Sequence, residues 1–168
     1  QKRRTQALKE LKELAEFFFD TSSVLSRLET TGTLSQALAK EMGLVGMAAR
    51  ASHLPRDVRQ DFPFGIYRVD PISIVTLSAG DVYARARLRS LEGKRSLEYL
   101  LRLLERLPAG TILERCENLS PSSLIVSLVE GWRGEIAHIV LTDEQSQIAR
   151  YKIVDPSFHN WTALALAM

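Results

Sequence analysis

The sequence predicts an α+β domain that is mainly helical and carries a small antiparallel sheet near its C-terminal end, from about residue 123 to 154. Three observations predict this fold class. An apolar stripe with helical spacing fills the segment after Asp81. Short polar turns separate three runs rich in β-branched residues, at 123–129, 135–142 and 148–154. Apolar residues make up 45% and charged residues 25% of the 168 positions, the balance of one ordinary globular domain.

The first third of the chain is predicted to hold three helices. Residues 3–19 repeat apolar side chains every three to four positions, which is typical of an amphipathic helix. A polar break leads to a short helix at 23–29 and then to a turn. Ser35 can cap a third helix that runs through Met42, and Gly43 can end that helix in the left-handed conformation.

Residues 43–74 are predicted to form a packed loop, because glycines and three prolines interrupt any regular pattern. A loop of this length usually serves a function or a partner. Asp81 can cap the long helix that follows, which is expected to end near Leu107, before Pro108. A last helix is predicted to start near Ser157.

The composition argues against several classes of protein. Cys116 is the only cysteine, so the chain can form neither an internal disulfide nor a thiolate metal cluster, and this thiol is expected to be inert. The three histidines, His53, His138 and His159, show no metal-ligand spacing. A net charge of +2 predicts no strong attraction to nucleic acid or anionic lipid. No apolar run approaches the ~20 residues that a membrane helix needs.

Helix, glycine turn and Arg50 in succession allow a helix-turn-helix interpretation, with DNA as the partner. A recognition helix needs several polar side chains that reach base edges, and this segment offers only Arg50. DNA binding would require an exposed basic face around that residue. We favour the simpler interpretation, a capped helix followed by a packed loop.

The Trp-Arg-Gly-Glu turn before the second strand is the most specific local feature. Gly134 permits a tight turn and the close approach of another chain or ligand. Arg133 supplies a planar and permanently charged group. The turn either presents Arg133 to a site or is a surface turn with an exposed ion pair, and the motif alone does not decide between them.

Two further features allow both a structural and a functional interpretation. Arg85 and Arg89 are four residues apart and share one face of the long helix. That face is either simply solvated, which we favour from the spacing alone, or placed against a carboxylate or an anionic cofactor. His138 shares a strand face with Ile136 and Val140, so it points either into a core or into a site.

Five segments in one order make the chain similar to a known family. They are SRLETTGTLSQALAKEMGLVGMAARAS, RDVR, GDVYARARLRSLEGKRS, RGEIAHIVLTD and DPSFHNWTAL. Together they resemble the large subunit of the energy-converting nickel–iron hydrogenases, of the formate-hydrogenlyase type, and equally the 49-kDa subunit of respiratory complex I, the NADH:quinone oxidoreductase. The resemblance covers about residues 5–168 and implies a single hydrogenase-large-subunit-like domain over 1–168.

The resemblance also implies a set of site residues. Through the Arg-Gly-Glu-x-x-His motif it assigns catalytic roles to Arg133, Glu135 and His138. Arg133 would lie beside the reacting centre, and the other two would take part in proton transfer. The residues implied to line the cavity are Arg50, Asp57, Arg59, Asp81, Arg85, Pro156, Ser157 and Asn160.

The function implied by the resemblance is that of a large-subunit segment in a membrane-associated redox complex. The complex would be peripheral to the cytoplasmic membrane, on its inner, cytoplasmic face, with no direct membrane span and no nucleic-acid partner. A partner small subunit with an iron–sulfur cluster would deliver electrons to protons or to quinone. The alternative is a non-catalytic structural subunit with a decayed metal site.

Two departures from the family shape these expectations. Hydrogenases hold their nickel–iron centre in two Cys-x-x-Cys pairs, and neither pair is in this chain. We therefore expect the C-terminal portion of a large subunit, without a metal or cofactor of its own and inactive alone. Trp132 stands where the family often has proline. The first helix, around Leu8 and Phe18, and the last, around Trp161 and Leu164, are expected to expose apolar surface that supports a homodimer.

Overall fold

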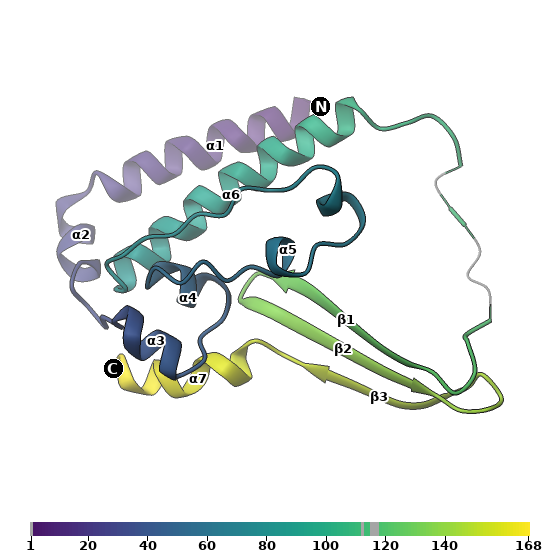
Figure 1. The fold of residues 1–168 in the computed structure, drawn as a ribbon. Helices are drawn as coiled ribbons and strands as arrows, with labels where there is room; N and C mark the ends of the chain where they lie inside the picture. Colours follow the sequence, from purple (N-terminus) through teal and green to yellow (C-terminus); the bar gives the residue numbers. More distant parts are fainter. Residues whose placement is uncertain (1, 112, 115–117) are drawn as a thin grey trace.

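The computed structural model describes residues 2–111, 113–114 and 118–168, so Cys116 and its expected inertness lie outside it. The described residues form seven α-helices, one 3₁₀-helix and one three-stranded sheet (Figure 1), which confirms the predicted fold class. The helices are α1 (Lys2–Phe19), α2 (Ser22–Leu28), α3 (Gln36–Glu41), α4 (Gly46–Ala51), α5 (Val58–Asp61), η1 (Gly65–Arg68), α6 (Val82–Glu105) and α7 (Ser157–Leu166). The strands are β1 (Leu124–Gly131), β2 (Gly134–Thr142) and β3 (Ile148–Val154).

The long helix α6 crosses the molecule and packs along α1 (Figure 1). Its predicted cap is confirmed, because the amide of Ala84 donates a hydrogen bond of 2.7 Å to Oδ1 of Asp81. The second carboxylate oxygen of Asp81 accepts a hydrogen bond of 2.9 Å from the amide of Thr30. Asp81 therefore both starts α6 and fixes the turn between α2 and α3.

The predictions for α3 are also confirmed. The amide of Leu38 donates to Oγ of Ser35 at 3.2 Å, and Gly43 adopts a φ of 68° where the helix ends. Behind α3, a small core forms where α3 and α4 meet α7. Its buried members include Leu44, Ala49 and Ala163. Small side chains in this core let the three short helices lie close together.

The prediction of a packed loop at 43–74 was wrong, because α4, α5 and η1 all lie within it. α4 is six residues long and almost wholly buried, so it has no polar stripe from which helical periodicity could be recognised. Its stability comes from tertiary packing. Phe62 and Phe64 in this segment are 62% and 53% exposed, whereas Tyr67 stacks on Tyr99.

The arrangement of α3 and α4 does not support the helix-turn-helix interpretation. The side chain of Arg50 is 1% exposed and takes part in buried ion pairs. The exposed basic face around Arg50 that DNA binding would require is therefore not formed in the described part of the chain.

The sheet is antiparallel with strand order β1-β2-β3, as predicted, and it extends away from the helices (Figure 1). In its register, Gly131 lies opposite Gly134 at the β1–β2 turn, and His138 lies opposite Ser127. β3 leads directly into α7, so the sheet places the β1–β2 turn next to α7. Among the described helices, none is both long and apolar enough to cross a membrane.

Candidate functional site

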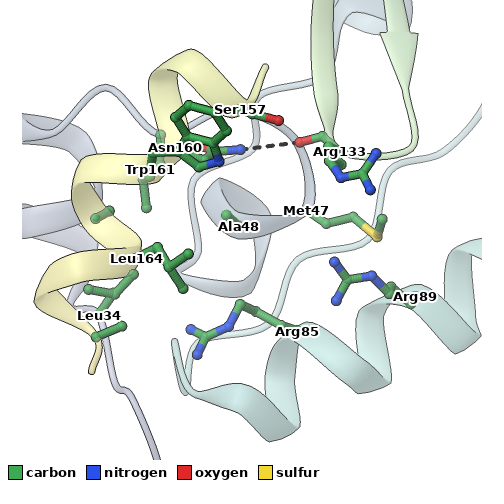
Figure 2. Close-up of a pocket in the computed structure, with 13 residues that line it drawn as sticks. Leu34, Met47, Ala48, Arg85, Arg89, Arg133, Ser157, Asn160, Trp161 and Leu164 are labelled. Carbon is green, nitrogen blue, oxygen red and sulfur yellow. Dashed lines mark hydrogen bonds between the residues drawn. The ribbon is translucent and has the colours of Figure 1, made fainter. Parts of the chain in front are cut away.

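A cavity of about 260 Å³ lies where α4, α6, α7 and the β1–β2 turn meet (Figure 2). Its walls combine apolar side chains with three arginines. The lining residues are Leu34, Leu44, Met47, Ala48, Arg85, Arg89, Arg133, Ser157, Asn160, Trp161, Ala163, Leu164 and Ala167. We call this space the arginine cavity.

The long helix supplies two of the three arginines. Arg85 and Arg89 are one helical turn apart, so both project from α6 toward the cavity (Figure 2). The guanidinium of Arg85 donates hydrogen bonds to the carbonyls of Gly80 (2.8 Å) and Gly32 (3.0 Å). Burial lowers the pKa of Arg85, as does the nearby Arg89 cation, and Asp81 opposes this shift. Arg85 thus has a structural role at the edge of the cavity, and Arg89 does not share it.

The third arginine is placed by a contact between two glycines. Gly134, with a φ of 133°, follows Arg133 and touches Gly46 at the start of α4. A methyl group added to Gly46 would lie 2.3 Å from the Cα of Gly134, so no other residue fits at this crossing. The contact holds the β1–β2 turn against α4, and the side chain of Arg133 lines the cavity from there.

Asn160 of α7 fixes the same crossing through hydrogen bonds to both chain segments. Its Oδ1 accepts from the amide of Val45 at 3.1 Å, and its Nδ2 donates to the carbonyl of Val45 at 3.4 Å and to that of Arg133 at 3.3 Å. One side chain therefore joins α7, the start of α4 and the β1–β2 turn. This bonding fixes the main chain from which Arg133 extends.

The arginine cavity has an unbalanced charge. Among the described residues, three guanidinium groups line it and no carboxylate does. The ion pairs formed by the described residues include neither Arg89 nor Arg133. Asp155 is an acidic group that Arg133 influences: hydrogen bonding to Ser157 lowers the pKa of Asp155, and the Arg133 cation lowers it further. Asp155 is fully exposed and does not line the cavity.

Three of the predicted lining residues lie elsewhere, in a buried ion cluster between α4, α5, α6 and β1. Arg50 donates to Glu92 at 2.8 Å and to Glu130 at 2.9 Å, while Arg59 pairs with Asp57 at 2.5 Å. Burial alone would lower the pKa of Arg50, but the surrounding carboxylates raise it above its ordinary value. Arg50, Asp57 and Arg59 thus hold these elements together and do not line the arginine cavity.

The cluster holds more carboxylates than cations, and this imbalance affects the pKa of Glu130. Burial raises the pKa of Glu130, and Asp57 raises it further, while Arg50 offsets only part of the shift. Of the other predicted lining residues, Asp81 caps α6 and Pro156 is buried at the start of α7. Arg85, Ser157 and Asn160 are the ones that do line the arginine cavity together with Arg133.

The other two predicted catalytic residues lie apart from the arginine cavity. Glu135 is half-buried and lines a second cavity of about 280 Å³ together with Glu130 and His159. His138 lies further along β2, where its Nδ1 is 2.5 Å from the hydroxyl of Tyr151 on β3. The structure therefore does not bring Arg133, Glu135 and His138 into one site.

The sequence reasoning did not name several residues that form the cavity. Arg89 was recognised as a neighbour of Arg85 but not placed in the site, although the spacing of four residues puts both on one face. The apolar wall of Met47, Trp161 and Leu164 had no signal of its own, because such residues are typical of core or of exposed surface. In the buried ion cluster, Glu130 was not predicted either, since a glutamate at the end of a strand is usually solvated.

A nickel–iron centre of the hydrogenase type does not fit the donors present. Of the residues that the structure describes, none with a thiolate, imidazole or carboxylate side chain lines the arginine cavity. Within the described residues, no group of three or more such donors is arranged to hold a metal ion. We therefore derive no step through such a centre.

Comparison with known proteins identifies the chain's relatives. Residues 1–123 match the family model of the 49-kDa subunit of the respiratory-chain NADH dehydrogenase. The chain is 31% identical over 175 residues to an NADH-quinone oxidoreductase subunit of Roseiflexus sp. (strain RS-1), covering 94% of this chain and 47% of that protein. It is 26% identical over 159 residues to formate hydrogenlyase subunit 5 of Escherichia coli (strain K12), covering 95% of this chain and 28% of that protein.

A solved structure shares the fold. A chain of the membrane-bound sulfane sulfur reductase, an archaeal respiratory membrane complex, superposes with a TM-score of 0.83 at 22% identity. The match covers 98% of this chain and 50% of that one. The chain spans less than half the length of the curated relatives described above.

Proposed function

Because the chain belongs to the family of the 49-kDa subunit of respiratory-chain NADH dehydrogenase, we propose that it forms part of the large subunit of a membrane-associated redox complex. A partner subunit with an iron–sulfur cluster passes electrons toward the arginine cavity. The acceptor there is a quinone or protons, in keeping with relatives named as NADH-quinone oxidoreductase and formate hydrogenlyase subunits. The complex is peripheral to the membrane on its cytoplasmic face.

The observation that carries this proposal is the lining of the arginine cavity. Two separate segments of the family resemblance, 133–135 and 156–160, contribute Arg133, Ser157 and Asn160 to one cavity. Guanidinium groups beside a reacting centre stabilise negative charge that develops during electron transfer, and apolar walls strengthen that effect by limiting water. Among the described residues, neither the main chain nor an ion pair engages the guanidinium of Arg133, and the same holds for Arg89.

Proton transfer is the second part of the proposal. Glu135 lines the second cavity beside Glu130, whose raised pKa keeps its proton available closer to neutral pH. Histidine is the side chain best suited to exchange protons near neutrality, and His138 is hydrogen-bonded to Tyr151. We propose that Glu135 and His138 each take part in proton transfer, from separate positions on β2.

A structural subunit without redox chemistry is the second candidate. The observation in its favour is that, in the part of the chain that the structure describes, no thiolate, imidazole or carboxylate side chain lines the arginine cavity. Such a subunit would keep the buried ion cluster, which maintains the fold, but would have no need for unpaired arginines at a cavity.

Replacement of Arg133 in the intact complex tests the proposal. Arg133→Lys keeps a positive charge but replaces the planar guanidinium with a mobile ammonium group. We expect turnover to fall about tenfold or more, at about 1.4 kcal/mol per decade, with assembly unchanged on native gels. Arg150→Lys, an exposed substitution on β3, is the matched control. Unchanged turnover in Arg133→Lys would support the structural subunit instead.

A further inference from the structure

We propose that the arginine cavity binds a small organic anion, in which a carboxylate or similar acid group is joined to an apolar portion. The inference names the ligand class for the cavity in which we place the redox chemistry, and to that extent it rests on the proposed function. It requires no electron transfer, so binding can be measured separately from turnover.

The charge of the cavity carries the first part of the inference. Arg89 from α6 and Arg133 from the β1–β2 turn approach the same space from different walls (Figure 2). No hydrogen bond or ion pair of the described residues engages either guanidinium. Like charges held around one space repel each other, and an anion between them removes that cost while accepting charge-assisted hydrogen bonds.

Arg85 makes the site more selective than a basic surface patch. Its guanidinium is held by the carbonyls of Gly80 and Gly32, so its charge is fixed at the edge of the cavity. Ser157 and Asn160 line the cavity from α7, where hydrogen bonds to Val45 and Arg133 hold Asn160 in place. A ligand with one acid group thus meets a fixed charge in a defined position, as small-molecule sites require.

The apolar wall carries the second part. Met47, Trp161 and Leu164 line the cavity, and Trp161 is 69% exposed at its opening. A fully hydrated inorganic ion gains nothing from these side chains, whereas a carbon skeleton buries apolar surface against them. A volume of about 260 Å³ suits a ligand the size of one substituted ring.

Benzoate and its neutral analogue, benzyl alcohol, provide a matched pair of probes. The chain has two tryptophans, so the indole N–H signal of Trp161 can be followed by NMR with little overlap. We expect benzoate to shift the Trp161 signal to saturation and to bind at least about tenfold more tightly than benzyl alcohol, since one charge-assisted hydrogen bond contributes at least that much.

Charge-removing variants locate the site. Arg89→Gln and Arg133→Gln should each weaken benzoate binding about tenfold. Arg150→Gln, which removes an exposed charge on β3, should leave it unchanged. Arg85 is not substituted, because its loss would release the carbonyls that it binds. Circular dichroism checks that each variant folds. If Arg133→Gln does not fold, benzoate binding to Arg89→Gln decides the test, because Arg89 is exposed.

Several results would overturn the inference. The first is a lack of saturable benzoate binding, and the second is equally tight binding of benzyl alcohol. The third is unchanged benzoate binding in Arg89→Gln. The fourth is displacement of benzoate by sulfate at equal affinity, because the apolar wall would then have no role in binding. The redox proposal fails separately, through unchanged turnover in Arg133→Lys. That variant keeps its positive charge and should retain benzoate binding.

Discussion

Arginine has different roles in two regions next to α4, the buried ion cluster and the arginine cavity. In the buried ion cluster, Arg50 and Arg59 are paired with three carboxylates and join four elements of the fold. In the arginine cavity, Arg89 and Arg133 line an open space without a carboxylate among the lining residues. An arginine paired in the core maintains the structure, whereas an arginine left unpaired at a cavity is available to a ligand.

Removal of a paired arginine should have the largest effect. Arg50→Met leaves Glu92, Glu130 and Asp57 buried with only Arg59 to balance them. Breaking a buried ion pair by removing one partner costs about 3–5 kcal/mol. We expect the free energy of unfolding, measured by urea denaturation, to fall by about that amount.

Arg89→Met is the matched control for that measurement, because it removes an exposed guanidinium with no ion pair among the described residues. Its effect should stay within about 0.5 kcal/mol. If the two substitutions destabilise the protein equally, the contrast between the two groups of arginines is wrong.

The contact between Gly46 and Gly134 separates the two regions, and a methyl group there should be the next most damaging change. In Gly46→Ala the new Cβ would lie 2.3 Å from the Cα of Gly134, at a φ of 63°. Backbone on both sides must move, so we expect a loss of about 3 kcal/mol in the free energy of unfolding.

Gly43→Ala separates the two causes of that loss. Gly43 has a φ of 68°, yet nothing lies within 4 Å of an added Cβ. This variant has only the cost of the left-handed conformation, about 1–2 kcal/mol. Equal losses for Gly43→Ala and Gly46→Ala, in thermal or urea unfolding, would mean that the close contact is unimportant.

Loss of the Asn160 side chain should be a smaller change that acts on one region only. Asn160→Ala removes the hydrogen bonds to Val45 and Arg133, which we expect to lower the free energy of unfolding by about 1–2 kcal/mol. Benzoate binding at the arginine cavity should weaken as well, because the main chain that carries Arg133 is no longer fixed. An unchanged affinity would show that the glycine contact alone positions the arginine.

The sequence was most informative where local chemistry decides the structure. Asp81 and Ser35 were recognised as helix caps because their side chains bond main-chain groups three residues away, and the strands were recognised from their β-branched residues and short turns. α4 was missed because a buried helix of six residues leaves no periodic pattern, and its packing depends on Gly134, far along the chain.

The site residues were also predicted incompletely because their surroundings depend on residues far along the chain. Family resemblance grouped Arg50 with Arg85 and Arg133, since all three lie in matching motifs. Only the three-dimensional arrangement reveals that Arg50 faces carboxylates from α5, α6 and β1 while Arg133 faces a cavity. Which charges are paired depends on residues up to 80 positions apart, as Arg50 and Glu130 are, and no local motif encodes that pairing.

The smallest predicted effect is the pH dependence of stability that Glu130 causes in the ion cluster. Burial raises the pKa of Glu130 above its ordinary value of 4.5. The folded protein then holds a proton that the unfolded chain has lost, so the contribution of Glu130 to stability is fully present below about pH 4.5 and is lost as the pH rises through the raised pKa. For a single proton the slope is at most about 1.4 kcal/mol per pH unit.

Glu130→Gln tests this directly, because glutamine resembles the protonated acid. The variant and the original chain should be about equally stable below pH 4.5, and the variant should become the more stable of the two toward neutral pH. Loss of a carboxylate from this cluster would thus stabilise the protein, whereas loss of Arg50 would destabilise it, since three carboxylates face two guanidinium groups there. Urea denaturation at several pH values measures the difference, with Glu144→Gln in an exposed turn as the control for a lost charge. A variant that is less stable than the original chain at neutral pH would show that the cluster needs its third carboxylate and that its charges are balanced.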